Sequence, residues 1–131
     1  MIYLDSCILI YLVERTPSLS ERIELALVKP PGQQYAISPL VRLECLVGPM
    51  REGDRSSQQA FRRVFDRLVE LPITREVFDA ATKFRAYQGL KTPDALHLAT
   101  ARHGKCAGLW TNDDRFAKTA PGFAVNLKHL C

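Results

Sequence analysis

Residues 1–13 read MIYLDSCILIYLV, a short apolar run that meets an acid and then continues with helical spacing. Ile2 to Leu4 is typical of a buried central strand. Ser6 can cap a helix running from Cys7 to about Val13. A strand that passes directly into a helix, with Asp5 at the junction, is the repeating unit of an α/β fold.

The same alternation continues along the chain. Further strands are expected over 35–37, 107–110 and 123–125, with a poor edge strand over 71–73 because Pro72 lacks a ladder donor. Helices are expected over 21–28, 39–47, 57–70, 75–87, 93–103 and 113–118, and residues 51–55 read as a charged, flexible connection. We therefore predict a single α/β domain over residues 1–131, with a short parallel sheet of four to five strands flanked by helices on both faces.

Composition limits the function classes. The chain has 131 residues, a hydrophobic fraction of 47% and a formal net charge of +4. A modest basic excess suits an enzyme acting on a polyanion, although many globular proteins carry such a charge without a functional reason. No apolar run approaches the length of a membrane span, and no signal peptide is recognised, so a cytoplasmic location is expected.

The cysteines offer little support for zinc or disulfides. Their spacing contains no C-x-x-C pair, and two of them, Cys7 and Cys45, lie in apolar runs typical of small core residues. The chemistry is therefore sought among the acids.

Four acids stand at the expected start of a helix or just inside one: Asp5, Glu44, Asp94 and Asp113. Parallel strands would bring them to one edge of the sheet, where ligands of open α/β folds bind. At about 5 Å and an effective dielectric near 20, each pair of carboxylates would repel by roughly 3 kcal/mol. Such a cluster needs a cation, and a hard divalent ion with oxygen ligands fits best.

Each acid also has a simpler explanation. Asp5 and Asp94 could serve only the helix dipole, although Asp94 begins a helix that is apolar on nearly every side. Glu44 lies beyond the first turn and projects from an apolar stripe, which the dipole does not explain; its alternative is a pairing with Arg42.

Two adjacent acids follow the strand expected at 107–110. Asp113 is nearer the strand end and is chosen as the site residue, with Asp114 as a spare or outer acid. Thr111 and Asn112 could hydrogen-bond the neighbouring carboxylates and fix their geometry.

Taken together, four segments resemble the PIN-domain ribonucleases, and among them the VapC toxins of bacterial and archaeal toxin–antitoxin pairs. The segments are Ile2-Tyr3-Leu4-Asp5-Ser6, residues 38–44 (SPLVRLE), residues 92–101 (TPDALHLATA) and residues 109–116 (LWTNDDRF). They occur in the family's order across nearly the whole chain.

The resemblance implies that Asp5, Glu44, Asp94 and Asp113 are the family's acidic quartet. It implies a Mg²⁺ or Mn²⁺ cofactor, endoribonuclease activity, homodimerisation and inhibition by a cognate antitoxin. Ser6 fills the usual Ser/Thr position beside the first acid. One departure is Cys7, where asparagine is commoner; since a thiol is a weak hydrogen-bond partner, less support for the site is expected there.

The expected mechanism is metal-assisted hydrolysis of a phosphodiester bond, leaving 5′-phosphate and 3′-hydroxyl ends. Asp5 and Asp94, with Glu44, are expected to hold one ion, while Asp113 helps place a second ion or the attacking water. One- and two-metal schemes both remain open.

Residues around the quartet are assigned more weakly. Phosphate contacts are expected from Arg42, Lys91 and Arg115, with solvated surface charge as an equal alternative. His97, one turn after Asp94, could join the site, but a satisfied or partly exposed helix histidine is expected.

Two other functions compete with a nuclease. A phosphoaspartate enzyme or receiver domain also carries acids at strand ends, but Asp5 is not followed by a second acid two residues later. A catalytically silent PIN-like module that binds protein or RNA is the alternative from a different class, and a Mn²⁺ titration would separate it from an enzyme. The helices on either side of residues 51–55 offer apolar faces for an antitoxin, or simply pack within the domain. Transfer, ribosomal and messenger RNA all fit as substrates.

Overall fold

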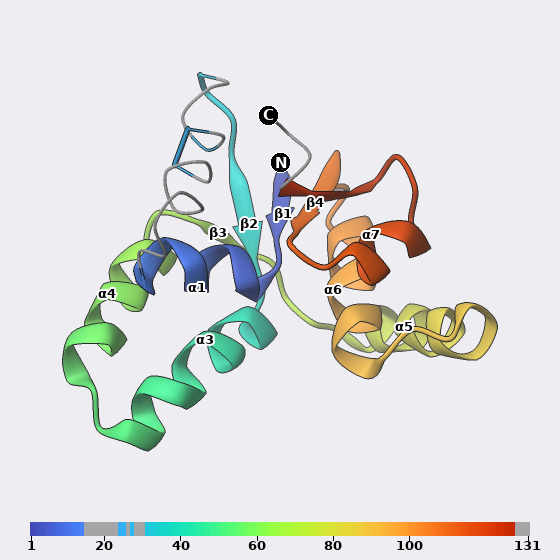
Figure 1. The fold of residues 1–131 in the computed structure, drawn as a ribbon. Helices are drawn as coiled ribbons and strands as arrows, with labels where there is room; N and C mark the ends of the chain where they lie inside the picture. The colour runs from blue at the N-terminus through green and yellow to red at the C-terminus, as the bar shows by residue number, and fades with distance from the viewer. Residues whose placement is uncertain (15–23, 26, 28–30, 128–131) are drawn as a thin grey trace.

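A computed structural model describes residues 1–14, 24–25, 27 and 31–127 of the chain (Figure 1). Its centre is a five-stranded parallel sheet with the strand order β3-β2-β1-β4-β5. The strands are β1 (Ile2–Leu4), β2 (Tyr35–Ile37), β3 (Val69–Glu70), β4 (Gly108–Thr111) and β5 (Ala124–Asn126). The predicted α/β class and parallel sheet are confirmed.

Helices lie on both sides of this sheet. Their bounds are α1 (Ser6–Glu14), α3 (Pro39–Glu52), α4 (Arg55–Phe65), α5 (Arg75–Gln88), α6 (Thr92–His103) and α7 (Asp114–Thr119). Figure 1 shows α1, α3 and α4 together on one side and α5 with α6 on the other. Residues 24, 25 and 27 are helical, and the remainder of the helix expected over 21–28 lies outside the described residues.

The strand order places a topological switch at β1. The chain passes from β1 outward through β2 to β3, and then returns to the opposite side of β1 with β4 and β5. Ile2 pairs with Tyr35 on one side and with Gly108 on the other. In open α/β sheets the crevice at such a switch, outside the carboxyl ends of the strands, is where ligands bind.

The central strands are buried because both faces are covered. Tyr3, Ala36, Ile37 and Leu109 have no exposed surface, and they belong to one apolar core with the inner faces of the helices. Short continuous apolar runs of this kind are typical of parallel strands. The core therefore holds β1 and β4 rigidly at the point where their carboxyl ends meet.

The helix predicted over 39–47 is longer than expected and runs through Pro49 to Glu52. Gly53 ends it in the left-handed conformation, with φ of 68°. The N–H groups of Gly53 and Asp54 then bond the carbonyls of Met50 and Pro49 at 3.2 and 2.8 Å. This closing turn gives partners to carbonyls at the helix end that would otherwise have none. The prediction took Gly48-Pro49 as the end of the helix and so missed the end at Gly53.

The prediction of a flexible connection over 51–55 is also wrong. Its first residues belong to α3, and Asp54 caps α4 by accepting hydrogen bonds from the Ser57 N–H and hydroxyl at 3.0 and 2.7 Å. The helix predicted over 57–70 begins at Arg55 and ends at Phe65. The edge strand expected over 71–73 is instead β3, Val69–Glu70. A turn after Phe65 brings the chain alongside β2 before Pro72 is reached.

The remaining elements agree with the predictions to within one or two residues, as is usual for element ends. Thr74 caps α5 by accepting a hydrogen bond from the Val77 N–H at 3.4 Å, and Pro93 stands in the first turn of α6. Among the described residues no helix has the length and apolar character to cross a membrane.

Candidate functional site

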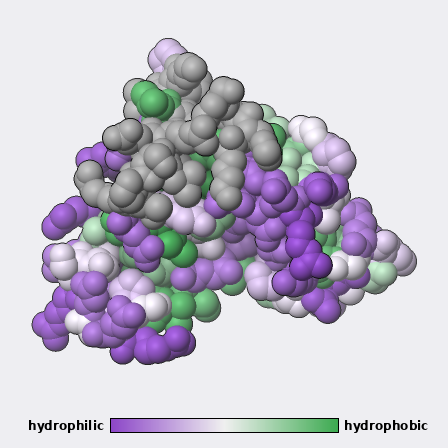
Figure 2. Space-filling model, viewed as in Figure 1, coloured by the Kyte–Doolittle hydropathy of each residue, from purple (hydrophilic) through white to green (hydrophobic). Residues whose placement is uncertain are grey.

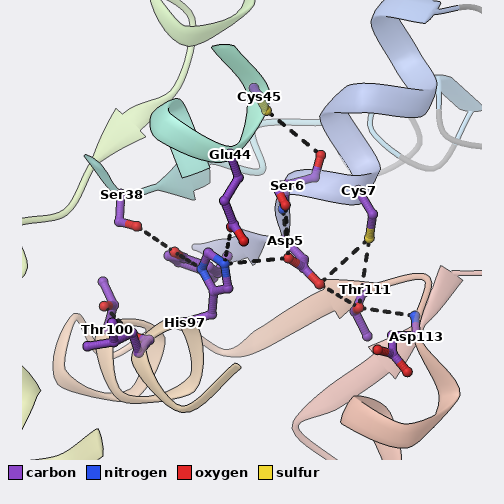
Figure 3. Close-up of polar contacts among 12 residues, drawn as sticks. Asp5, Ser6, Cys7, Ser38, Glu44, Cys45, His97, Thr100, Thr111 and Asp113 are labelled. Carbon is purple, nitrogen blue, oxygen red and sulfur yellow. Dashed lines mark hydrogen bonds and ion pairs between the residues drawn. The ribbon is translucent and has the colours of Figure 1, made fainter. Parts of the chain in front are cut away.

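Asp5 lies at the centre of the site, directly after β1 and beside the end of β4. Its backbone N–H bonds the Trp110 carbonyl at 3.0 Å, which extends the pairing of the two strands to the acid itself. The Oδ1 atom accepts the Ser6 N–H at 2.8 Å, and Oδ2 accepts the Thr111 hydroxyl at 2.7 Å. These bonds fix the buried carboxylate in one orientation (Figure 3).

Glu44 reaches the same point from the second turn of α3. Its Oε1 atom lies 2.6 Å from Nε2 of His97, and that nitrogen is also 3.6 Å from Oδ1 of Asp5. The three side chains place ligand atoms within 4.8 Å of one another. Figure 3 shows them converging from three separate elements.

The alternative pairing of Glu44 with Arg42 is wrong. Arg42 lies on the neighbouring face of α3, where its Nε is 3.4 Å from Oε1 of Glu70 and its guanidinium stacks over the Phe65 ring. Glu44 is thus available to the acidic cluster, while Arg42 is engaged at the β3 edge, and its expected phosphate contact stays a prediction.

Asp94 and Asp113 complete the cluster. Both line a cavity of about 420 Å³ that also contains Asp5 and Glu44. Burial, and then the charges of Asp5 and Asp113, raise the pKa of Asp94 above its ordinary value. Asp113 is exposed and caps α7, since its Oδ1 accepts the N–H groups of Arg115 and Phe116 at 2.9 and 3.4 Å. The structure therefore brings all four predicted acids to one cavity.

The residues expected to support the acids have different roles. Thr111 bonds Asp5 as expected, and Ser6 does so mainly through its backbone, its hydroxyl being 3.5 Å from Oδ1. Asp114 accepts a hydrogen bond from Asn126 at 2.7 Å, which ties it to β5. The Asn112 side-chain oxygen is buried and has no hydrogen-bond partner among the described residues.

Cys7 occupies the position where asparagine was expected from the family. Its Sγ lies 3.6 Å from Oδ2 of Asp5 and 3.9 Å from Oγ1 of Thr111, and it accepts the Asn112 N–H at 3.3 Å. Burial, and then the charge of Asp5, raise the pKa of the thiol to about 12. Cys7 therefore stays protonated and gives Asp5 only a weak S–H donor.

The donor set fits a hard divalent cation. In the described parts of the chain, no lysine or arginine forms an ion pair with Asp5, Asp94 or Asp113. Three carboxylates thus share a cavity without a lysine or arginine in ion-pair contact, and Asn112, whose side-chain oxygen has no partner among the described residues, lines the same cavity. Oxygen ligands of this kind suit Mg²⁺ or Mn²⁺.

Two basic side chains stand beside the acids. Lys91 and Arg115 line a second cavity of about 240 Å³, which shares Asp94 and Asp113 with the first. Both side chains are exposed, so they are accessible to a large anionic ligand.

The sequence prediction missed His97. It was expected to be an ordinary helix histidine, yet it is 1% exposed and contacts two of the acids. The available signal was its position three residues after Asp94, on the same face of a helix that is otherwise apolar. Of the other histidines, His103 is exposed and residue 129 lies outside the described residues.

Comparison with known proteins agrees with this fold. The family model described as PIN domain matches residues 2–121. Among solved structures, a toxin–antitoxin complex from Klebsiella pneumoniae contains a chain 26% identical in sequence, with a TM-score of 0.79; the match covers 97% of this chain and 98% of that one. No curated protein matches the chain in sequence at a significant level.

More distant structures share the fold. VapBC2 from Rickettsia felis, bound to a DNA fragment from its promoter, is 22% identical with a TM-score of 0.73, and the match covers 96% of this chain and 98% of that chain. VapC20 from Mycobacterium tuberculosis, described as a sarcin-ricin loop cleaving toxin, is 16% identical with a TM-score of 0.75, covering 92% and 95%.

Proposed function

The chain belongs to the PIN-domain family, and on that premise we propose that it is a metal-dependent endoribonuclease, the toxin of a type II toxin–antitoxin pair. The observation that carries the proposal is the meeting of Asp5, Glu44, Asp94 and Asp113 in one cavity. The similarity to a chain of a toxin–antitoxin complex and to a sarcin-ricin loop cleaving toxin supports this reading.

Asp5, Asp94, Glu44 and Asp113 would hold Mg²⁺ or Mn²⁺. When bound, such an ion lowers the pKa of water and offsets negative charge on the phosphoryl group. Asp5 enters the reaction already oriented, because Ser6 and Thr111 hold both of its oxygens. Preorganisation of this kind reduces the reorganisation needed when the substrate binds.

Substrate placement falls to the basic residues next to the acids. Lys91 and Arg115 line the smaller cavity, where an RNA backbone phosphate would pass on its way to Asp94 and Asp113, which line both cavities. Hydrolysis by water, without help from a ribose 2′-hydroxyl, leaves 5′-phosphate and 3′-hydroxyl ends. Arg42 is given no phosphate contact in this proposal, because its guanidinium is paired with Glu70.

An antitoxin partner is proposed for the apolar face of α3. Leu43, Val47 and Met50 are 61%, 45% and 52% exposed and follow one another at helical spacing. Figure 2 shows apolar surface over this helix, bordered by hydrophilic side chains. An amphipathic helix could lay its own apolar face along such a stripe. Val47→Glu should then weaken antitoxin binding, and Phe78→Glu on α5 is the matched control.

Homodimerisation and a cytoplasmic location complete the proposal, since RNA and antitoxin would be met there. Light scattering coupled to size-exclusion chromatography measures the first directly.

Cleavage of a structured RNA pool tests the nuclease. The purified protein is assayed with Mg²⁺, with EDTA and as Asp94→Asn, while Asp79→Asn, an exposed acid on α5, is the control. We expect metal-dependent cuts with 5′-phosphate ends, lost in Asp94→Asn and retained in Asp79→Asn. Mapping the ends identifies the target RNA.

Equal background in every lane, with antitoxin removed, would contradict the proposal and favour a PIN-like binding module. Calorimetric titration with Mn²⁺ separates the two functions further. An enzyme of this design binds Mn²⁺ through its acids, whereas a module that lacks the metal site shows no binding heat.

A further inference from the structure

A buried chain of three polar side chains leads into the acidic site and has no part in the mechanism described above. Tyr3 lies on β1, Ser38 immediately precedes α3 and His97 is on α6. Their residues are 0%, 0% and 1% exposed. Polar groups this deep in an apolar core are costly unless each one is hydrogen-bonded, so their arrangement needs an explanation.

The three side chains form one continuous line of short contacts. The Tyr3 hydroxyl lies 2.7 Å from Oγ of Ser38 and 2.7 Å from Nδ1 of His97. The opposite ring nitrogen, Nε2, is 2.6 Å from Oε1 of Glu44. The line therefore begins in the core and ends on a carboxylate of the site (Figure 3).

The donor and acceptor of each hydrogen bond in this line can be assigned. The Glu44 carboxylate only accepts, so Nε2 of His97 carries the proton of that bond. In the neutral imidazole Nδ1 is then an acceptor, and the Tyr3 O–H supplies its hydrogen. Ser38 in turn donates to the Tyr3 oxygen.

We propose that Ser38, Tyr3 and His97 are positioning residues that fix the Glu44 carboxylate beside Asp5, with His97 acting as a hydrogen-bond donor and not as a metal ligand. This inference rests on the proposed function and deepens it. A glutamate side chain has several rotatable bonds, and its entropy opposes a defined geometry. The donor on Nε2 selects one orientation, because Tyr3 sets the tautomer of the ring.

The three side chains Ser38, Tyr3 and His97 also connect the parts of the fold that supply the acids. Asp5 follows the strand that carries Tyr3, Glu44 stands on the helix that Ser38 precedes, and Asp94 shares α6 with His97. Each of the three side chains thus lies in, or next to, the element that positions one of the acids. Outer groups that orient ligands in this way typically change metal affinity by about 10- to 100-fold when removed.

Tautomer and metal affinity are measured separately from RNA cleavage. Nitrogen-15 NMR of the histidine rings in the metal-free protein should show His97 with its proton on Nε2. Tyr3→Phe keeps the ring and removes the hydroxyl, and it should shift the His97 signals away from this pure tautomer. Tyr35→Phe is the matched control, since the Tyr35 hydroxyl donates to the Leu27 carbonyl at 3.0 Å.

Mn²⁺ affinity by calorimetry provides the second readout. We expect a loss of about 10- to 100-fold for His97→Leu and a smaller loss for Tyr3→Phe. His97→Gln, whose amide N–H can still reach Glu44, should recover most of the affinity. Ser38→Ala removes the hydrogen bond between Ser38 and the Tyr3 hydroxyl, which is the one farthest from the acids, and leaves the side chains next to the acids unchanged.

Three results would overturn the proposal: a proton on Nδ1 in the wild type, equal losses of Mn²⁺ affinity in Tyr3→Phe and Tyr35→Phe, or no recovery in His97→Gln. A diamagnetic Cd²⁺ titration that moves Nε2 as a directly bound nitrogen would likewise show a ligand and not a donor. Absence of RNA cleavage alongside an intact tautomer and intact Mn²⁺ binding would refute only the nuclease.

Discussion

Glu44→Gln should make the metal-free protein more stable and the metal-loaded protein less stable than the wild type. The ligand atoms of Asp5 and Glu44 lie within 4.8 Å of each other. At an effective dielectric of about 20, that separation corresponds to roughly 3 kcal/mol of repulsion. An amide removes it but weakens the charge-assisted bond from His97 by about 1 kcal/mol. The net gain is about 1–2 kcal/mol after solvent screening at the partly exposed Glu44.

Bound metal should make the wild type more stable than Glu44→Gln. At a free Mn²⁺ concentration of about 1,000 times the wild-type Kd, binding stabilises the wild type by about 4.1 kcal/mol. If the variant binds about 100-fold more weakly, the same concentration contributes only about 1.4 kcal/mol to it. The wild type should then be more stable by roughly 1 kcal/mol.

Urea unfolding followed by circular dichroism measures both states, once in EDTA and once with Mn²⁺. Glu52→Gln is the control, because Glu52 is an exposed glutamate at the end of the same helix. It should leave both free energies of unfolding unchanged. The reasoning would be refuted by a Glu44→Gln protein that is less stable than the wild type in EDTA, or by equal Mn²⁺ increments in the two proteins.

Three further outcomes are expected. Burial, and then the charges of Asp5 and Asp113, raise the pKa of Asp94, so the ionised carboxylate opposes folding. As pH falls through that raised pKa, urea unfolding should show that the metal-free protein becomes more stable, because Asp94 is protonated. Over the same range, calorimetry should show that the affinity for Mn²⁺ is lost. An unchanged affinity across that range would contradict this. Lys91→Ala and Arg115→Ala should each lower RNA affinity and reduce the salt slope by about one, as measured by filter binding; variants with the wild-type slope would exclude phosphate contacts. Since burial raises the pKa of Cys7 and Cys45 to about 12, iodoacetamide at pH 8 should modify them far more slowly in the native protein than in urea, as followed by mass spectrometry; equal rates would show exposed thiolates.

Much of the fold could be predicted because local signals and tertiary structure agree. The run from Ile2 to Leu4 is apolar at every position, and it forms a central strand in which Tyr3 and Leu4 are buried. The failures lie where local and tertiary signals conflict. Gly48 and Pro49 are both poor helix residues, yet α3 continues because Gly53 supplies a better end one turn later. Strand β3 has only two residues, both exposed, so no periodicity could indicate it.

The acids could be predicted for the same reason. Asp5, Asp94 and Asp113 follow a strand or lie in the first turn of a helix, and Glu44 lies one turn further along its helix; a parallel sheet brings such positions to one edge. His97 could not be assigned in this way, because its contacts depend on Tyr3 and Glu44 arriving from two other elements. The ion pair of Arg42 with Glu70 could not be predicted, because sequence proximity to Glu44 does not show which helix face meets Glu70.

The position of β1 in the centre of the sheet has a consequence for synthesis. Ile2 pairs with Gly108, more than 100 residues later in the chain, and Asp113 follows that second strand. The first acid therefore leaves the ribosome long before its neighbour across the sheet exists. At about 5–20 residues per second, several seconds pass before the pocket can assemble. A nascent chain, or one truncated before β4, carries Asp5 and Glu44 yet cannot form the complete acidic site.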